Sequence, residues 1–255
     1  MTTDSFPNDP SRRRAVLVLQ DHDIERCNYE PGEARKLLDE EAYVLPFPLR
    51  TQGEIPIALQ NIVSARLARP GNMLVQSPYD DNFYEEAALA PQRFALAKHM
   101  YFSTLCMHLG AKEVTVEQID LSTRSGKSTL NVKGSRLGAN TQLDVTTEEL
   151  EKFSAQMHLR DEFEGGAADV VAAEELLRRT GLGLDQNMRA LVEMRRGGTN
   201  PLKSRKIVLS LSNEAKSNLN VVGRLSVPKF VKLSAEYDRI VKENQEYKLT
   251  VEVRF

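Results

Sequence analysis

Three short segments contain side chains that could do chemistry, and the first has the composition of a phosphate-binding loop. Gly126, Lys127 and Ser128 match the end of such a loop, in which backbone N–H groups and the lysine hold phosphates. A complete loop also needs a glycine five residues before Gly126, where the chain has Leu121, and a helix directly after the serine. The residues that follow alternate as in a strand, so we expect a polar hairpin turn here.

The second segment contains possible metal ligands. His99, Cys106 and His108 are close in sequence, and on a helix the first two share one side. His108 is turned away from Cys106 by about 160°, and the neighbouring sequence offers no fourth donor, whereas a site needs three or four converging donors. We therefore predict no metal site, and we expect Cys106 to be a small core residue.

The third segment is a polar cluster, Asp21-His22-Asp23 with Glu25, directly after the apolar run 15–19. Carboxylates and an imidazole at the end of a strand could do acid–base or metal chemistry. No second half of a site can be found, and the motifs of serine hydrolases, zinc proteases and dinucleotide-binding enzymes are absent. We expect no catalytic residues and no cofactor, and an enzyme built on the Asp21–Glu25 cluster is kept as an alternative.

Charge is segregated along the chain. Acidic side chains gather over 148–164, and basic side chains gather at the end of the helical block that follows. The two groups could solvate neighbouring helices of one chain, or they could form a surface for docking and self-assembly. Because long, hydrated side chains beside a Gly-Gly joint are seldom there for packing, we expect the basic group to point outward and to bind a partner. The predicted binding residues are Arg189, Arg195, Arg196, Lys203, Arg205 and Lys206.

Composition limits the classes of protein that fit. The net charge of −2, from 34 basic and 36 acidic residues, gives no strong signal for nucleic acid, and the absence of Trp removes the usual base-stacking platforms. The two cysteines, Cys27 and Cys106, are typical of a reducing compartment, so we expect a soluble, cytoplasmic protein. The apolar run after Arg12-Arg13-Arg14 is too short for an export signal, and no window is long and apolar enough to span a bilayer.

The elements that would position these residues follow from the period of the apolar side chains. We expect a flexible tail over 1–14, then a single α+β domain over 15–255 with a helical insert at about 148–201. Antiparallel amphipathic strands are predicted over about 112–146 and 206–255, on either side of a three-helix block whose first helix reaches residue 164. The N-terminal region before them is predicted to be mainly helical, with helices over 33–43, 57–67 and much of 73–110.

Function is predicted from these features together. The expected function is that of a non-enzymatic intracellular interaction protein, a component of a protein complex that binds a protein partner or assembles with itself as an oligomer. One alternative is a membrane-acting, pore-forming effector that rearranges its amphipathic strands. The second alternative is the enzyme based on Asp21–Glu25.

Overall fold

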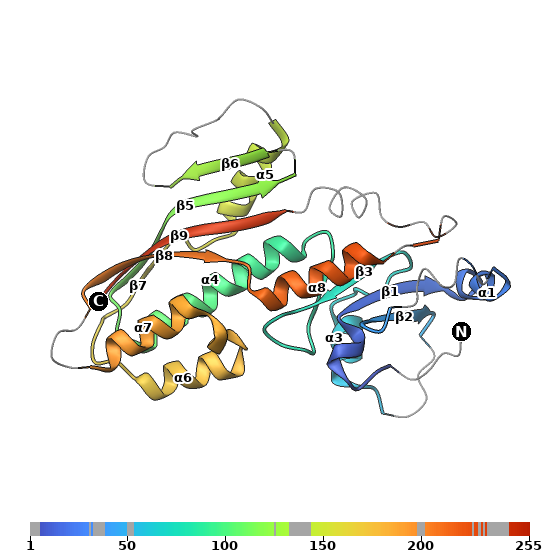
Figure 1. Cartoon of the computed structure of the whole chain (residues 1–255), viewed down its shortest axis with the longest axis horizontal. Coiled ribbons are helices and arrows are strands. Elements are labelled where there is room, and N and C mark those ends of the chain that lie inside the picture. The colour runs from blue at the N-terminus through green and yellow to red at the C-terminus, as the bar shows by residue number, and fades with distance from the viewer. Residues whose placement is uncertain are drawn as a thin grey trace. The chain divides into compact units, whose positions relative to one another are not determined.

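The computed structural model confirms an α+β fold. It describes residues 6–30, 32, 39–49, 54–124, 126–132, 144–197, 202–225, 227–228, 231, 233 and 245–255. Within this part of the chain there are seven α-helices, a mixed sheet of four strands and an antiparallel sheet of five strands (Figure 1). Two compact units contain them, unit 1 (Met1–Ala90 and Asn213–Lys242) and unit 2 (Pro91–Ser212 and Glu243–Phe255). The single domain over 15–255 stays a prediction.

Unit 1 is built on the mixed sheet. Its central strand β1 is parallel to β2 and antiparallel to β3, which in turn is antiparallel to β4. Helix α1 follows β1 directly, and α3 lies between β2 and β3 in the chain. The bounds are β1 Ala15–Gln20, α1 Asp21–Tyr29, β2 Ala42–Phe47, α3 Ile57–Ser64, β3 Met73–Gln76 and β4 Tyr84–Glu86.

The prediction that the N-terminal region is mainly helical is wrong. Residues 42–43, predicted at the end of a helix, belong to β2, and β3 lies where the long helical pattern was placed. β3 is buried at every position, so its apolar side chains do not alternate with polar ones and the strand period is hidden. Pro46 is tolerated in β2 because β2 is an edge strand. Helix α3 is confirmed, and residues 33–38 lie outside the described residues.

The segment predicted as a flexible tail packs on unit 1 from Phe6 onward. Phe6 is 7% exposed and meets Tyr43 edge to face, with ring centroids 5.3 Å apart. A 3-10 helix follows at Pro10–Arg13, and the Arg13 Nη1 donates to the Asp81 carbonyl at 2.6 Å and to the Tyr84 hydroxyl at 2.8 Å. Residues 1–5 of the predicted tail lie outside the described part of the chain.

Residues 213–224 form helix α8 (Asn213–Arg224), where the sequence analysis placed a strand. Val221 and its alternating neighbours resemble a strand, but Ala215, Asn218 and Val222 are buried at helical spacing. Asn218 obscured that stripe because it is a polar residue at a core position, where its amide donates to the Gln76 carbonyl at 3.0 Å.

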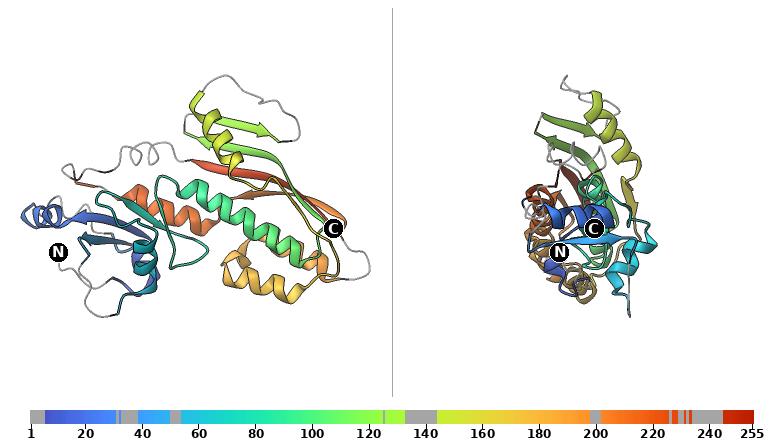
Figure 2. Two further views of the ribbon diagram at one scale, coloured as in Figure 1. Left: turned by 180° about the vertical axis from the view of Figure 1, so that it is seen from behind. Right: turned by 90° about the vertical axis from the view of Figure 1, so that its right-hand side faces the viewer.

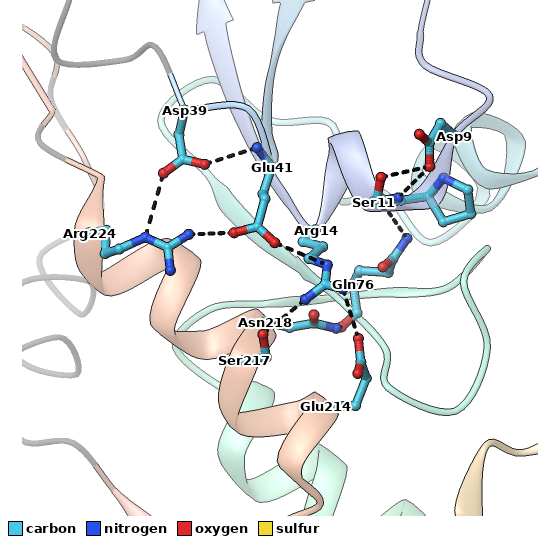
Figure 3. A network of polar contacts seen from close by, with 11 residues as sticks. Asp9, Ser11, Arg14, Asp39, Glu41, Gln76, Glu214, Ser217, Asn218 and Arg224 are labelled. Atoms are coloured by element: carbon cyan, nitrogen blue, oxygen red, sulfur yellow. Dashed lines mark hydrogen bonds and ion pairs between the residues drawn. The ribbon is translucent and has the colours of Figure 1, made fainter.

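A polar network joins α8 to the strands of unit 1 (Figure 3). Arg14 lies 3.4 Å from Glu41 and 3.3 Å from Glu214, and it donates to the Ser217 hydroxyl at 2.9 Å. Arg224, at the other end of α8, pairs with Glu41 at 2.5 Å. These contacts lie within unit 1, so α8 belongs to its framework.

Unit 2 is built on the antiparallel sheet, in the order β6-β5-β9-β8, with β7 paired to the start of β5. β5, β6 and β9 confirm three of the predicted strands, and β8 confirms the strand predicted from 206. Residues 144–146, predicted as part of a third meander strand, begin helix α5, and 133–143 lie outside the described residues. The bounds are β5 Glu113–Thr123, β6 Gly126–Asn131, α5 Asp144–Ala155, β7 Arg160–Glu162, β8 Ser204–Ser210 and β9 Glu246–Arg254.

Strand β9 forms the centre of the core of unit 2. Its residues Tyr247, Leu249, Val251 and Val253 are at most 2% exposed, and they alternate with polar residues on the opposite face. A bulge between Val116 and Gln118 shifts the register of β5, so the apolar residues on both sides of the bulge stay on the core face.

Helix α4 (Ala90–His108) runs between the sheet and the pair α6 (Val170–Arg179) and α7 (Gln186–Arg196) (Figure 2). The Lys98 ammonium, on a side chain only 4% exposed, lies 2.6 Å from the Asp185 carboxylate and 2.8 Å from the Ser210 carbonyl. This buried ion pair links α4, the start of α7 and the end of β8. The first helix of the predicted block was placed too long, because α5 ends at Ala155 and β7 follows.

Gly110 follows the end of α4 in the left-handed conformation, with φ +76°. A Cβ at Gly110 would lie 2.2 Å from the Gly166 carbonyl oxygen, so any side chain would collide with that backbone. Gly110 therefore allows the chain after β7 to pass closely over the end of α4.

Candidate protein-binding surface at the free edge of β8

The six predicted binding residues all lie in unit 2, in α7 and in or just before β8, but they do not form one surface of free charge. Arg196 pairs with Glu174 and lies 3.4 Å from Glu193. The Lys206 ammonium lies 2.7 Å from the Glu117 carboxylate, across the exposed face of the sheet. These two cations are already neutralised within unit 2. None of the carboxylates that they contact belongs to the acidic segment 148–164.

Arg195 is half-buried, which corrects the expectation that it points outward. Its Nε donates to the Leu109 carbonyl at 3.1 Å and its Nη1 to the Leu202 carbonyl at 3.1 Å. The guanidinium carbon lies 4.2 Å from the centroid of the Phe255 ring, a cation–π contact. Burial lowers the pKa of Arg195 from its ordinary value. Arg195 therefore joins the ends of α4, α7 and β9.

The adjacent arginines allow a matched test of this assignment. Arg195→Ala is expected to lower the free energy of unfolding by about 1–3 kcal/mol, because two carbonyls lose a donor and the Phe255 ring loses its cation. Arg196→Ala removes only exposed ion pairs and is expected to cost no more than about 0.5 kcal/mol. Urea unfolding of both variants measures the difference, and equal losses would contradict the structural role of Arg195.

Three of the six cations have no carboxylate partner among the described residues, namely Arg189, Lys203 and Arg205. Lys203 is exposed and directly precedes β8, and Arg205 is the second residue of β8. Among the described residues, the Arg205 guanidinium contacts one neutral polar group, the Met194 sulfur of α7, at 3.1 Å. Within the part of the chain that the structure describes, Lys203 and Arg205 therefore place positive charge without a carboxylate partner at the start of β8.

Strand β8 also has an open backbone edge. The Phe255 N–H donates to the Lys203 carbonyl, so in this antiparallel ladder residues 203, 205, 207 and 209 bond to β9. The N–H and C=O groups of Ser204, Lys206, Val208 and Ser210 then point away from β9. Only the Ser210 carbonyl has a partner within the described part of the chain, the Lys98 ammonium. The backbone groups of Ser204, Lys206 and Val208 have no hydrogen-bond partner among the described residues, and we call these groups open.

The side chains of these open positions are exposed as well. Ser204, Lys206 and Val208 lie on the polar face of the sheet, and Val208 is 52% exposed, although valine favours burial. An edge strand with open backbone groups is a template for another strand, and a lysine such as Lys206 discourages indiscriminate pairing. We use the name β8 edge for residues 203–208. Chemically, it can bind an extended segment through backbone hydrogen bonds.

The structure places Lys127 of the glycine–lysine–serine sequence in a hairpin, as predicted. It lies in β6, and its ammonium is 3.1 Å from the Asp120 carboxylate on β5. Burial raises the pKa of Asp120, but hydrogen bonds from Thr129, Gln118 and Lys127 act against it, and the net effect is a lowered pKa. Because a strand follows instead of a helix N-terminus, the segment cannot hold phosphates as a phosphate-binding loop does.

The Asp21–Glu25 cluster begins α1, where the sequence analysis expected either a site or a solvated exit from β1. Asp21 and Asp23 lie in the first helical turn, where the helix dipole favours carboxylates. The His22 Nε2 lies 3.2 Å from the Asp23 carboxylate, and the His22 side chain is 70% exposed. These contacts explain the cluster as the start of a helix.

A buried polar cluster in unit 2 was missed by sequence reasoning, because Asp161 is far from its partners in the chain. The Ser103 hydroxyl of α4 donates to the Asp161 carboxylate of β7 at 2.5 Å. His99, one helical turn earlier, is 3% exposed, and its Nε2 has no hydrogen-bond partner within the described residues. An imidazole often serves as the base for a serine nucleophile, but here the Ser103 proton is directed to the Asp161 carboxylate and not to His99. The contact therefore joins α4 to β7.

His99 gives unit 2 a pH-dependent stability. Burial lowers the pKa of His99 below its ordinary value of 6.5, and the opposing effect of Asp161 does not offset it. As pH falls below about 6.5, the unfolded chain binds a proton that the folded chain resists, so stability is lost. We expect the free energy of unfolding to fall less between about pH 7.5 and 5.5 in His99→Gln than in wild type or in the exposed control His22→Gln. Identical pH dependence in all three proteins would contradict this origin.

The remaining features of the described part offer no second site. Cys27 and Cys106 are buried and are not joined in a disulfide, and burial raises the pKa of the Cys106 thiol well above its ordinary value. Among the described residues no three His, Cys, Asp or Glu side chains are arranged to hold a metal ion, and none of the helices there is long and apolar enough to cross a membrane.

No family model, curated protein sequence or solved structure matches the chain.

Proposed function

We propose that this chain is a non-enzymatic interaction protein, a component of a protein complex, and that it binds its partner by strand addition at the β8 edge. The observation that carries the proposal is the open row of backbone groups at Ser204, Lys206 and Val208. Backbone hydrogen bonds provide affinity in this mode of recognition, and the flanking side chains provide specificity. No contact among the described residues favours the pore-forming or the enzymatic alternative.

A pair of substitutions at Val208 tests strand addition. Val208→Pro removes an outward N–H and places a ring in the path of an added strand, yet it leaves the hydrogen bonds to β9 in place. Val208→Thr keeps the N–H and the branched side chain, so it is the matched control. Peptides are first selected on the wild-type chain from a displayed library of random peptides long enough to span β8. Their affinity for both variants is then measured by titration.

We expect Val208→Pro to weaken the selected peptides by about tenfold or more, and Val208→Thr to change their affinity little. Thermal melting of both variants checks that unit 2 stays folded. A selection that yields no binding peptide, or peptides that bind a folded Val208→Pro variant as tightly as wild type, would contradict strand addition at β8.

A further inference from the structure

We infer that the segment which adds to β8 is an acidic strand of a partner protein, with its carboxylates at alternate positions and an apolar residue three positions away. This inference rests on the proposed function and names the chemistry of the partner. In a sheet, a residue directly opposite another has its side chain on the same face. The positions of Lys203, Arg205 and Val208 along β8 can therefore be translated into a sequence pattern.

The charges at the start of β8 determine the acidic part of the pattern. Lys203 and Arg205 are two residues apart, so their side chains leave the strand on one face, and neither has a carboxylate partner in the described residues. Lys206, on the other face, is already paired with Glu117. Partner carboxylates are therefore expected opposite positions 203 and 205, and not opposite position 206.

The apolar part of the pattern comes from Val208. It lies three residues from Arg205, hence on the opposite face, and half of its surface is exposed. An apolar residue opposite Val208 would cover that surface. From its N-terminus to its C-terminus, an antiparallel partner strand should then have the pattern apolar-x-x-acidic-x-acidic. A parallel partner strand should have the pattern acidic-x-acidic-x-x-apolar. The order of the pattern reveals the direction of the added strand.

A second copy of the chain fits this edge less well than an acidic segment does. The sequence of β8, SRKIVLS, contains no carboxylate, so a second β8 leaves Lys203 and Arg205 uncompensated. Antiparallel pairing about residue 205 or 206 would also place Arg205 or Lys206 against its own copy, and like charges directly opposite are destabilising.

The peptides selected on the full wild-type chain are sequenced, and their affinity is measured by titration for two variants that have the same change in net charge. Lys203→Glu/Arg205→Glu reverses the two free cations, and Lys152→Glu/Arg178→Glu reverses two exposed cations elsewhere in unit 2. We expect one of the two acidic patterns in the selected peptides and a loss of about tenfold or more in affinity for the first variant only. Peptides in which the acids are replaced by lysine should regain affinity for that variant.

Two other outcomes would contradict the acidic partner strand. The acidic partner is refuted if the selected peptides lack acidic residues or bind both charge variants equally. The Val208→Pro variant still tests strand addition in that case. A dimer of the wild-type chain in sedimentation velocity that Val208→Pro dissociates would identify a second copy as the occupant and would also refute the inference.

Discussion

Replacing Val251 with aspartate is expected to lower the free energy of unfolding by about 4 kcal/mol or more, because it buries a charge that has no partner. Val251 is 0% exposed at the middle of β9, opposite Val116 of β5 and Ile207 of β8. The substitution therefore disturbs the central strand of unit 2 and both of its neighbours. Urea unfolding, with the loss of tertiary structure as the readout, measures the effect.

The neighbouring residue gives the matched control. Thr250 is on the polar face of β9, so Thr250→Asp is expected to cost about 1 kcal/mol at most. If the Val251→Asp and Thr250→Asp variants lose the same free energy of unfolding, the two faces of β9 have been assigned the wrong way round.

Lys98→Met is expected to have the second largest effect, a loss of about 3–5 kcal/mol. The substitution keeps the apolar length of the side chain but leaves the Asp185 carboxylate and the Ser210 carbonyl without their cation. Asp185 also caps α7 by accepting from the backbone N–H groups of Asn187 and Met188, so it stays close to the ion-pair position. Urea unfolding of the variant measures the loss.

Two further variants separate charge from packing at this site. Lys152→Met removes an ion pair whose side chains are both 66% exposed, and it should cost no more than about 0.5 kcal/mol. Asp185→Asn keeps a cap oxygen and removes the charge, so the double variant with Lys98→Met should regain part of the loss. If the Lys98→Met variant proves as stable to urea as the Lys152→Met variant, the buried ion pair does not stabilise the junction of α4, α7 and β8, and the assignment is contradicted.

The strands that the sequence predicted well are those with one polar face. β9 alternates without a fault, and its alternation is read directly from the residues. β1 and β3 are buried on both faces, so their period is hidden, and β3 was placed inside a long helix. Helix α8 was read as a strand because Asn218 occupies a core position of its helical stripe and is satisfied by a residue from β3.

The candidate surface could be predicted from the sequence only in part. A run of basic residues is visible in the sequence, but their partners are not. Arg195 contacts a carbonyl 86 residues away, and Lys206 is neutralised by a glutamate on β5. The open edge is likewise non-local, because it depends on β8 being last in the strand order and on which residues bond to β9.

Amide-resolved hydrogen exchange in unit 2 tests the β8 edge most directly. In the free protein, the N–H groups of Lys206 and Val208 should exchange rapidly, whereas those of Ile207 and Leu209, which bond to β9, should be slow. In complex with a selected peptide, Lys206 and Val208 should become as protected as their neighbours. Slow exchange at Lys206 and Val208 in the free protein, or fast exchange that persists in the complex, would contradict an edge that is open and binds a partner strand.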